Sequence, residues 1–241
     1  RGLPLPKGLL LTGVPGCGKS LTAKAVASNW GYPLIRFDIA AAFGGIVGES
    51  ESNIRQALRV AEAASPCVLW IDEIEKGLAG SGGSGDLDSG TTQRVFGTIL
   101  TWLNEVSKPV FVVATANNLA NLPPELKRKG RFDEIFFVDL PEHESRKEIL
   151  HLHIKNREPG ALDSIDLDTL ASKSDGFTGA ELENVVKDAQ FFAFNDGNRP
   201  LTQNDIMEEI VRLNPMSESM KTDIDAMRIE ANKIGQKASK D

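Results

Sequence analysis

The amino-acid sequence predicts an α/β domain with a doubly wound parallel sheet, followed by a small all-helical domain. Short apolar runs alternate with longer helical patterns through residues 8–140, and the strand-like runs stop after Pro141. Uninterrupted apolar strands separated by helices indicate a parallel sheet that is covered on both faces. We therefore predict a first domain over residues 1–140, and a helical domain with a C-terminal helix over residues 141–241.

The first domain is expected to alternate strands with helices. Each strand is a short apolar run, and each helix repeats its apolar residues every three to four positions. Within the helix expected at 50–65, for example, Ile54, Leu58 and Ala61 fall on one face. The strands are expected at 8–13, 33–38, 67–72, 109–117 and 134–140, and the helices at 19–31, 50–65 and 91–106.

The second domain is expected to contain helices only. They are expected at 143–155, 166–174, 179–194, 203–213 and 217–236. The last pattern carries Met220, Ile224, Met227 and Ile234 at helical spacing. It predicts a final helix that either packs on its own domain or docks on a neighbouring subunit.

The composition is ordinary for a globular protein and disfavours several function classes. The net charge of -7 in 241 residues argues against nucleic-acid binding. Cys17 and Cys67 lack the spacing of metal ligands and indicate a reducing compartment. No apolar run reaches the ~20 residues of a membrane span, and the opening RGLPLPKG lacks the apolar core of a signal peptide. Because the chain does not begin with Met, we expect it to be a piece of a longer protein.

The segment GVPGCGKS at 13–20 matches the phosphate-binding pattern G-x-x-x-x-G-K-S/T, between an expected strand and an expected helix. Its glycines allow the backbone to point successive N–H groups at phosphate oxygens, and the helix N-terminus adds partial positive charge. A chance match in a glycine-rich turn is the alternative, and the flanking elements argue against it. The residues expected to bind the nucleotide are Gly13, Pro15, Gly16, Cys17, Gly18, Lys19, Ser20 and Leu21.

Individual side chains then have predicted chemical roles. Lys19 is expected to reach the β- and γ-phosphates, and Ser20 to offer its hydroxyl to Mg²⁺. Cys17 contributes its backbone N–H, so its thiol is either merely tolerated or a redox sensor. Asp72 and Glu73 end the apolar strand CVLWI, where ligands bind in open α/β sheets. Asp72 is the expected second Mg²⁺ ligand, and Glu73 the base that accepts a proton from an attacking water; the alternative is an ordinary acidic strand end.

With these motifs, the chain resembles the AAA family of ATPases, in the group that includes katanin, spastin and valosin-containing protein. The resemblance runs from Gly2 to about Pro200. VATANN resembles the family's sensor strand, which implies that Asn117 lies beside the γ-phosphate. PPELKRKGRFDEIFFVDLP resembles the second region of homology, which implies that Arg128 and Arg131 are arginine fingers.

The helical domain carries further likenesses to this family. DGFTGAEL resembles the small-domain signature, which implies that Gly179 and Ala180 lie close to the adenine. EILHLHIKN resembles the first small-domain helix and implies a nucleotide contact for His153. Without the resemblance, His153 would be interpreted as an ordinary surface or core histidine. Asp38 falls near the family's polar switch position, and a turn-capping aspartate fits equally well. The implied fold is an AAA+ P-loop NTPase domain followed by a helical lid.

The segment GGIVGES resembles the first pore loop, through which family members grip polypeptide. Members that pull hard usually carry an aromatic at the position of Ile46, and an aliphatic side chain offers less contact area. Threading of a polypeptide is therefore doubtful. The glycine- and serine-rich segment 77–90 lies near the second pore loop, and a flexible connection is the alternative. The pore-loop residues are Gly45, Ile46, Val47 and Gly48.

The resemblance implies an ATP-hydrolysing ring, expected to be a hexamer, that uses ATP and Mg²⁺ to remodel a protein substrate of unknown identity. An ATP-dependent scaffold or switch with little mechanical work is the alternative, favoured by Ile46. A DNA-acting machine is disfavoured by the acidic charge. The stretches FGGIVGESES and SPCVLWIDEIEK resemble cyanobacterial and plastid-encoded AAA proteins. The expected location is therefore the cytoplasm, or the plastid stroma if that subgroup likeness holds.

Overall fold

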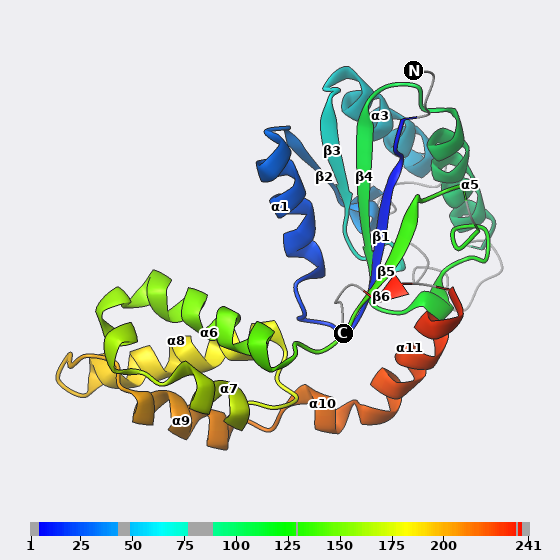
Figure 1. Ribbon diagram of the computed structural model, residues 1–241. Helices are drawn as coiled ribbons and strands as arrows, with labels where there is room; N and C mark the ends of the chain where they lie inside the picture. The colour runs from blue at the N-terminus through cyan, green and yellow to red at the C-terminus, as the bar shows by residue number, and fades with distance from the viewer. Residues whose placement is uncertain (1–4, 43–48, 77–88, 129, 235, 238–241) are drawn as a thin grey trace. The chain divides into compact units, whose positions relative to one another are not determined.

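The computed structural model describes residues 5–42, 49–76, 89–128, 130–234 and 236–237 (Figure 1). Its contacts divide the chain into two units. The first comprises residues 1–13, 19–138 and 227–241, and the second comprises residues 14–18 and 139–226. The domain division at residues 140 and 141 that we expect from the sequence remains a prediction. Residues 227–241, which the sequence analysis assigned to the helical domain, group by their contacts with the first unit.

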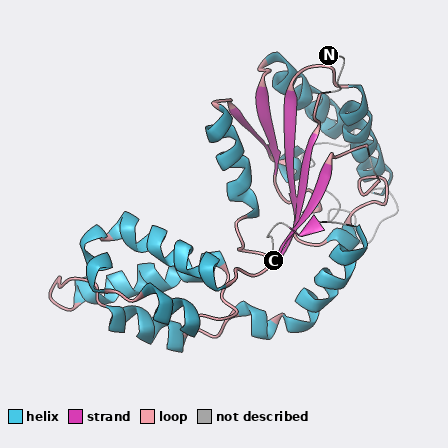
Figure 2. Ribbon diagram, viewed as in Figure 1, coloured by secondary structure: helices cyan, strands magenta, loops and turns pink. Residues whose placement is uncertain are grey.

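The first unit is built on a parallel sheet in the order β2-β3-β4-β1-β5-β6 (Figure 2). Its strands are β1 (Gly8–Gly13), β2 (Leu34–Phe37), β3 (Cys67–Ile71), β4 (Val110–Ala116), β5 (Glu134–Val138) and β6 (Gln236–Lys237). All five residues of β3 are buried, as expected for a strand that is covered on both faces. The predicted α/β class with a parallel sheet is confirmed.

Helices cover both faces of this sheet. They are α1 (Lys19–Trp30), α2 (Ile39–Ala42), α3 (Glu49–Ala63) and α5 (Ser89–Glu105). Figure 1 shows α1 on one face, with α3 and α5 on the other. The alternation along β1 fits this arrangement, because Leu10 packs in one core cluster with Ile54 and Ile99, and Leu11 in another with Ala23. The sheet is therefore doubly wound.

The end of the chain differs from the predicted single helix at 217–236. It forms α10 (Met216–Ser219), α11 (Lys221–Ile234) and β6. Met220 caps α10 with φ -107° and ψ 19°, which interrupts the helix. After α11, Gln236 and Lys237 pair with Phe136 and Phe137 of β5. The contacts of this final segment place it beside the sheet of the first unit.

The second unit packs helices α6 (His143–Arg157), α7 (Leu167–Lys173), α8 (Gly179–Asn195) and α9 (Gln203–Arg212) around one core. Fully buried side chains from three of these helices meet there, such as Leu150, Leu182 and Ile206. Capping boxes begin α8 at Thr178 and α9 at Thr202. The structure also contains 3-10 turns η1 (Leu119–Asn121) and η2 (Pro159–Ser164), which the sequence analysis did not predict.

Asp205 gives the second unit a pH-dependent contribution to stability. Its carboxylate accepts hydrogen bonds from Arg199 Nη1 and Nη2, each at 2.7 Å, and from the hydroxyl of Thr202 at 2.6 Å. The Arg199 guanidinium is the main reason why the pKa of Asp205 falls from an ordinary 3.8 to about 2. The folded state therefore binds this proton less readily than the unfolded state. The stabilisation is present above the ordinary pKa and is lost as the pH falls from about 4 to about 2.

Replacing Asp205 by Asn is therefore expected to lower the free energy of unfolding by about 1–3 kcal/mol at neutral pH, because the network loses its negative charge and one of its two acceptor oxygens. The variant should also lose less stability than the wild type when the pH is lowered below about 4. Urea unfolding followed by circular dichroism across this range measures both effects. An Asn variant with the same pH slope as the wild type would show that Asp205 is not the titrating group.

Candidate functional site

The carboxyl ends of β3 and β4 bring together a hydroxyl, a carboxylate and a second hydroxyl. Asp72 follows β3, and its Oδ1 accepts hydrogen bonds from Ser20 Oγ at 2.9 Å and from Thr115 Oγ1 at 2.7 Å. Ser20 lies in the first turn of α1, and Thr115 lies on β4. Carboxylate and hydroxyl oxygens are the ligands that Mg²⁺ prefers. The structure thus places the two predicted metal ligands, Ser20 and Asp72, in direct contact.

Glu73 and Asn117 meet at the same edge of the sheet. Asn117 Nδ2 donates to Glu73 Oε1 at 3.1 Å, and its backbone N–H donates to Glu75 Oε1 at 2.8 Å. The backbone N–H of Glu73 donates to Thr115 Oγ1 at 2.9 Å. Glu73 has φ 49°, in the left-handed region that is unfavourable for a residue other than glycine. Strain of this kind is found at functional sites, where surrounding contacts hold it in place.

Lys76 is a further partner of Glu73. The two side chains form an ion pair three residues apart, and this hydrogen bond is the main cause that raises the pKa of Lys76. Lys76 is 56% exposed and Glu73 is 35% exposed, so solvent screens the pair. Glu73 thus shares its carboxylate between an amide and a cation.

The phosphate-binding motif follows β1 and precedes α1, as the sequence predicts. The backbone takes positive φ at Gly13, Gly16 and Gly18, with values of 128°, 77° and 89°. A Cβ at Gly13 would lie 2.1 Å from the carbonyl oxygen of Val138, so only glycine fits there. Lys19 is 6% exposed, and its Nζ donates to the Gly13 carbonyl at 2.8 Å. Leu21, in contrast, exposes 64% of its surface on α1.

Residues 14–18 make contacts within the second unit. The backbone N–H of Ala180 donates to the carbonyl of Gly16 at 3.0 Å. A Cβ at Gly179 would lie 3.3 Å from that same oxygen, and one at Gly16 would lie 3.2 Å from Ala180 Cβ. The start of α8 and the phosphate-binding segment are therefore packed closely at Gly16. The predicted adenine contact of Gly179 and Ala180 remains a prediction.

His153 lies half-buried on α6. Burial is the main cause that lowers the pKa of its imidazole, with the Glu183 carboxylate acting in the opposite direction. The imidazole is therefore mainly neutral at neutral pH and can accept or donate a hydrogen bond at either nitrogen. Its contact with a nucleotide stays a prediction.

Arg128 and Arg131 lie in the turn between η1 and β5. Leu126 and Phe132 flank this turn and are buried, whereas Arg128 is exposed and Arg131 is half-buried. Among the residues that the structure describes, neither guanidinium makes a hydrogen bond or an ion pair. Their action on a phosphate group remains a prediction.

The predicted pore-loop residues Gly45, Ile46, Val47 and Gly48 lie outside the described residues, as does most of the glycine- and serine-rich segment 77–90. Asp38 is described, and its Oδ1 accepts from the backbone N–H of Ala41 at 3.2 Å. This contact matches the turn-capping interpretation of Asp38.

Sequence reasoning missed several residues of this site. Thr115 links Asp72 to Glu73, and Glu75 holds the backbone of Asn117. Arg36 Nη2 lies 3.9 Å from Asp72 Oδ2, with its guanidinium carbon 4.9 Å from the centre of the Trp70 ring. The sequence did offer one signal for two of these residues. Thr115 and Arg36 are polar residues within otherwise apolar strands.

Replacing Thr115 by Val tests the role of this hydroxyl. The variant keeps the shape of a 1% exposed side chain but removes the donor to Asp72 and the acceptor for Glu73. We expect the free energy of unfolding to fall by about 1–3 kcal/mol, because polar groups lose their partner. Urea unfolding measures this loss. Thr101→Val, on the exposed surface of α5, is the matched control, and an equal effect of the two substitutions would contradict the assigned role.

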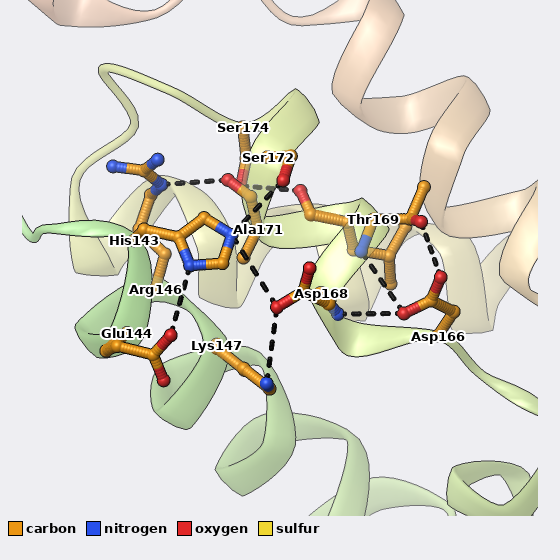
Figure 3. A network of polar contacts seen from close by, with 11 residues as sticks. His143, Glu144, Arg146, Lys147, Asp166, Asp168, Thr169, Ala171, Ser172 and Ser174 are labelled. Atoms are coloured by element: carbon orange, nitrogen blue, oxygen red, sulfur yellow. Dashed lines mark hydrogen bonds and ion pairs between the residues drawn. The ribbon is translucent and has the colours of Figure 1, made fainter.

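A second polar cluster joins α6 to α7 (Figure 3). His143, Glu144 and Asp168 form the one group of three possible metal-ligating side chains in the described residues. Glu144 Oε1 lies 3.3 Å from His143 Nδ1, whereas Asp168 Oδ1 lies 3.9 Å from Nε2. His143 Nε2 also lies 3.1 Å from the hydroxyl of Ser172 on α7. Lys147 also pairs with Asp168 at 3.3 Å, and the cluster is best described as a link between the two helices.

Comparison with known proteins identifies the family. The profile of the ATPase family associated with various cellular activities (AAA) matches residues 9–140, and that of the AAA+ lid domain matches residues 164–208. This chain belongs to the AAA family of ATPases. ATP or ADP and Mg²⁺ are the nucleotide and metal of this family, and Ser20, Asp72 and Lys19 present suitable groups for them.

Individual relatives can be aligned with nearly the whole chain. The AAA domain-containing protein ycf46 of Guillardia theta is 50% identical over 226 residues, which are 94% of this chain and 44% of that protein. The ycf46 protein of Trieres chinensis is 52% identical over 217 residues, covering 90% of this chain and 43% of that protein. The chain thus spans less than half the length of these relatives. The likeness to plastid-encoded AAA proteins is confirmed.

Two more distant relatives are named for activities that involve proteins. The proteasome-activating nucleotidase of Saccharolobus solfataricus is 32% identical over 228 residues, or 92% of this chain and 56% of that protein. The ATP-dependent zinc metalloprotease FtsH of Caldicellulosiruptor bescii is 34% identical over 223 residues, or 88% of this chain and 34% of that protein.

In the described part of this chain, no helix has both the length and the apolar character to cross a membrane.

Proposed function

We propose that this AAA protein hydrolyses ATP as a ring of identical subunits, and that the ring remodels a partner protein. The observation that carries the hydrolytic part is the cluster at the ends of β3 and β4. There Asp72 is held by Ser20 and Thr115, and Glu73 is held by Asn117. Membership of the AAA family identifies ATP or ADP as the nucleotide. The cluster supports the proposal that this chain hydrolyses ATP.

The residues of the site have separate roles in this proposal. Ser20 and Asp72 hold Mg²⁺, which neutralises charge on the phosphate oxygens when bound. Lys19 binds the β- and γ-phosphates through its ammonium group. Glu73 accepts a proton from the attacking water, and Asn117 holds the Glu73 carboxylate and the water in position.

The arginine turn supports a ring. The guanidinium groups of Arg128 and Arg131 have no partner among the described residues, and a guanidinium that stabilises phosphoryl transfer can come from a neighbouring subunit. We infer that both residues act on the nucleotide of the adjacent subunit. A hexamer is the expected assembly, since the family typically forms hexameric rings.

The partner is proposed to be a protein. Two relatives are named as a proteasome-activating nucleotidase and an ATP-dependent protease, and we extend the protein-directed activity of those names to this chain. The likeness to ycf46 proteins favours a plastid stroma or a bacterial cytoplasm as the location. The acidic net charge of -7 disfavours a nucleic-acid substrate.

An ATP-dependent scaffold or switch is the second candidate. Ile46 favours it, because an aliphatic side chain at that position grips polypeptide less well than an aromatic one. Steady-state ATP turnover with and without candidate unfolded proteins separates the two. Stimulated turnover that is lost in Ile46→Ala supports remodelling, whereas turnover that no protein stimulates supports the scaffold.

A further inference from the structure

The turn that carries Arg128 and Arg131 is fastened to the chain just before β1. Asp133 Oδ2 accepts from the backbone N–H groups of Lys7 and Gly8, at 2.7 and 2.9 Å. Lys7 Nζ donates to the carbonyl of Gly130 at 2.8 Å, and the N–H of Asp133 donates to the Gly8 carbonyl at 2.8 Å. The C-terminal side of the turn therefore has a rigid attachment.

The other side of the turn is fastened by the last helix. Lys127, which directly precedes Arg128, forms an ion pair with Glu230 of α11 at 3.6 Å. Lys127 is 16% exposed and Glu230 is 28% exposed, so this pair is better shielded than most surface ion pairs. Glu230 directly precedes Ala231, which is 5% exposed. After α11, the chain pairs with Phe136 and Phe137 of β5.

We propose that Glu230 is a positioning residue for the arginine turn. By holding Lys127 it fixes the backbone from which Arg128 projects, while Asp133 fixes the far side of the turn near Arg131. The inference rests on the proposed action of these arginines on a neighbouring subunit. A catalytic group displaced by about 1 Å can lose roughly 10²-fold in rate, so a partial loosening of the turn is sufficient to slow hydrolysis. The last helix then belongs to the catalytic apparatus that one subunit offers to the next.

Charge reversal tests this role. Glu230→Lys is expected to lower ATP turnover of assembled rings roughly three- to tenfold, because Lys127 is repelled and the turn loosens. Affinity for a fluorescent ATP analogue should stay unchanged, since Lys19 and Ser20 are untouched. The double variant Lys127→Glu/Glu230→Lys restores the pair with reversed charges and should regain most of the turnover. Asp223→Lys, an exposed position on the same helix, is the matched control and should turn over as the wild type does.

Mixing distinguishes positioning from general damage. A Glu230→Lys subunit still binds and hydrolyses ATP when its neighbour offers well-placed arginines, so mixing it with Lys19→Ala subunits should raise its turnover. Wild-type turnover by Glu230→Lys rings, or a loss that neither the double variant nor the mixture repairs, would overturn the inference. If a mixture of Arg131→Ala and Lys19→Ala subunits also fails to regain ATP turnover, then the proposed action of the arginines between subunits is wrong, and the role of Glu230 is not the cause of the failure.

Discussion

Replacing Glu73 by Gln is expected to reduce ATP turnover by roughly 10²- to 10⁴-fold, because the amide cannot accept the proton of the attacking water. The substitution removes the ion pair with Lys76 but keeps two other contacts of Glu73. The Gln Oε1 can still accept the hydrogen bond that Asn117 Nδ2 donates at 3.1 Å, and the backbone N–H still reaches Thr115. Release of phosphate from ATP under saturating conditions measures the loss.

ATP binding should survive this substitution. The groups expected to hold the phosphates and the metal are Lys19, Ser20 and Asp72, and none of them depends on the charge of Glu73. A fluorescent ATP analogue should therefore bind the variant with wild-type affinity. Glu105→Gln, an exposed carboxylate at the end of α5, serves as the control for the loss of one negative charge. Wild-type turnover by Glu73→Gln would show that another group accepts the proton.

The sequence was sufficient to predict the parts of this site that depend on local patterns. The phosphate-binding motif needs glycines at fixed spacing, and Gly13 shows why, since any Cβ there would collide with Val138. Asp72 and Glu73 were predictable because they end an uninterrupted apolar strand. Their roles in turnover remain predictions until the variants are measured.

The contacts that escaped prediction join residues far apart in the chain. Thr115 is one polar residue in an apolar strand, and only the pairing of β3 with β4 brings it to Asp72. The return of the C-terminal segment to β5 depends on a two-residue strand, which has no detectable period. The ion pair between Lys127 and Glu230 has no signature either, because either residue alone is an ordinary surface charge.

Two inactive variants are expected to regain activity when they are mixed. Lys19→Ala removes the ammonium group that binds the phosphates, so this subunit cannot hydrolyse ATP but still offers Arg128 and Arg131. Arg131→Ala removes an arginine finger, a change that costs roughly 10³- to 10⁵-fold in turnover, but its own phosphate site is intact. In a mixed ring, an Arg131→Ala subunit next to a Lys19→Ala neighbour has both halves of the site.

Turnover should therefore rise when the two variants are combined at equal concentration, and it should follow the proportion of mixed interfaces as their ratio is varied. Size-exclusion chromatography or electron microscopy establishes that rings form in each sample. The double variant Lys19→Ala/Arg131→Ala is the control, since mixing it with Lys19→Ala supplies no intact phosphate site and should restore nothing. If the single variants also restore nothing under conditions where mixed rings are present, Arg131 does not act across the interface. An arginine that acted within its own subunit would give that result, because each mixed ring would then contain only subunits that are inactive on their own.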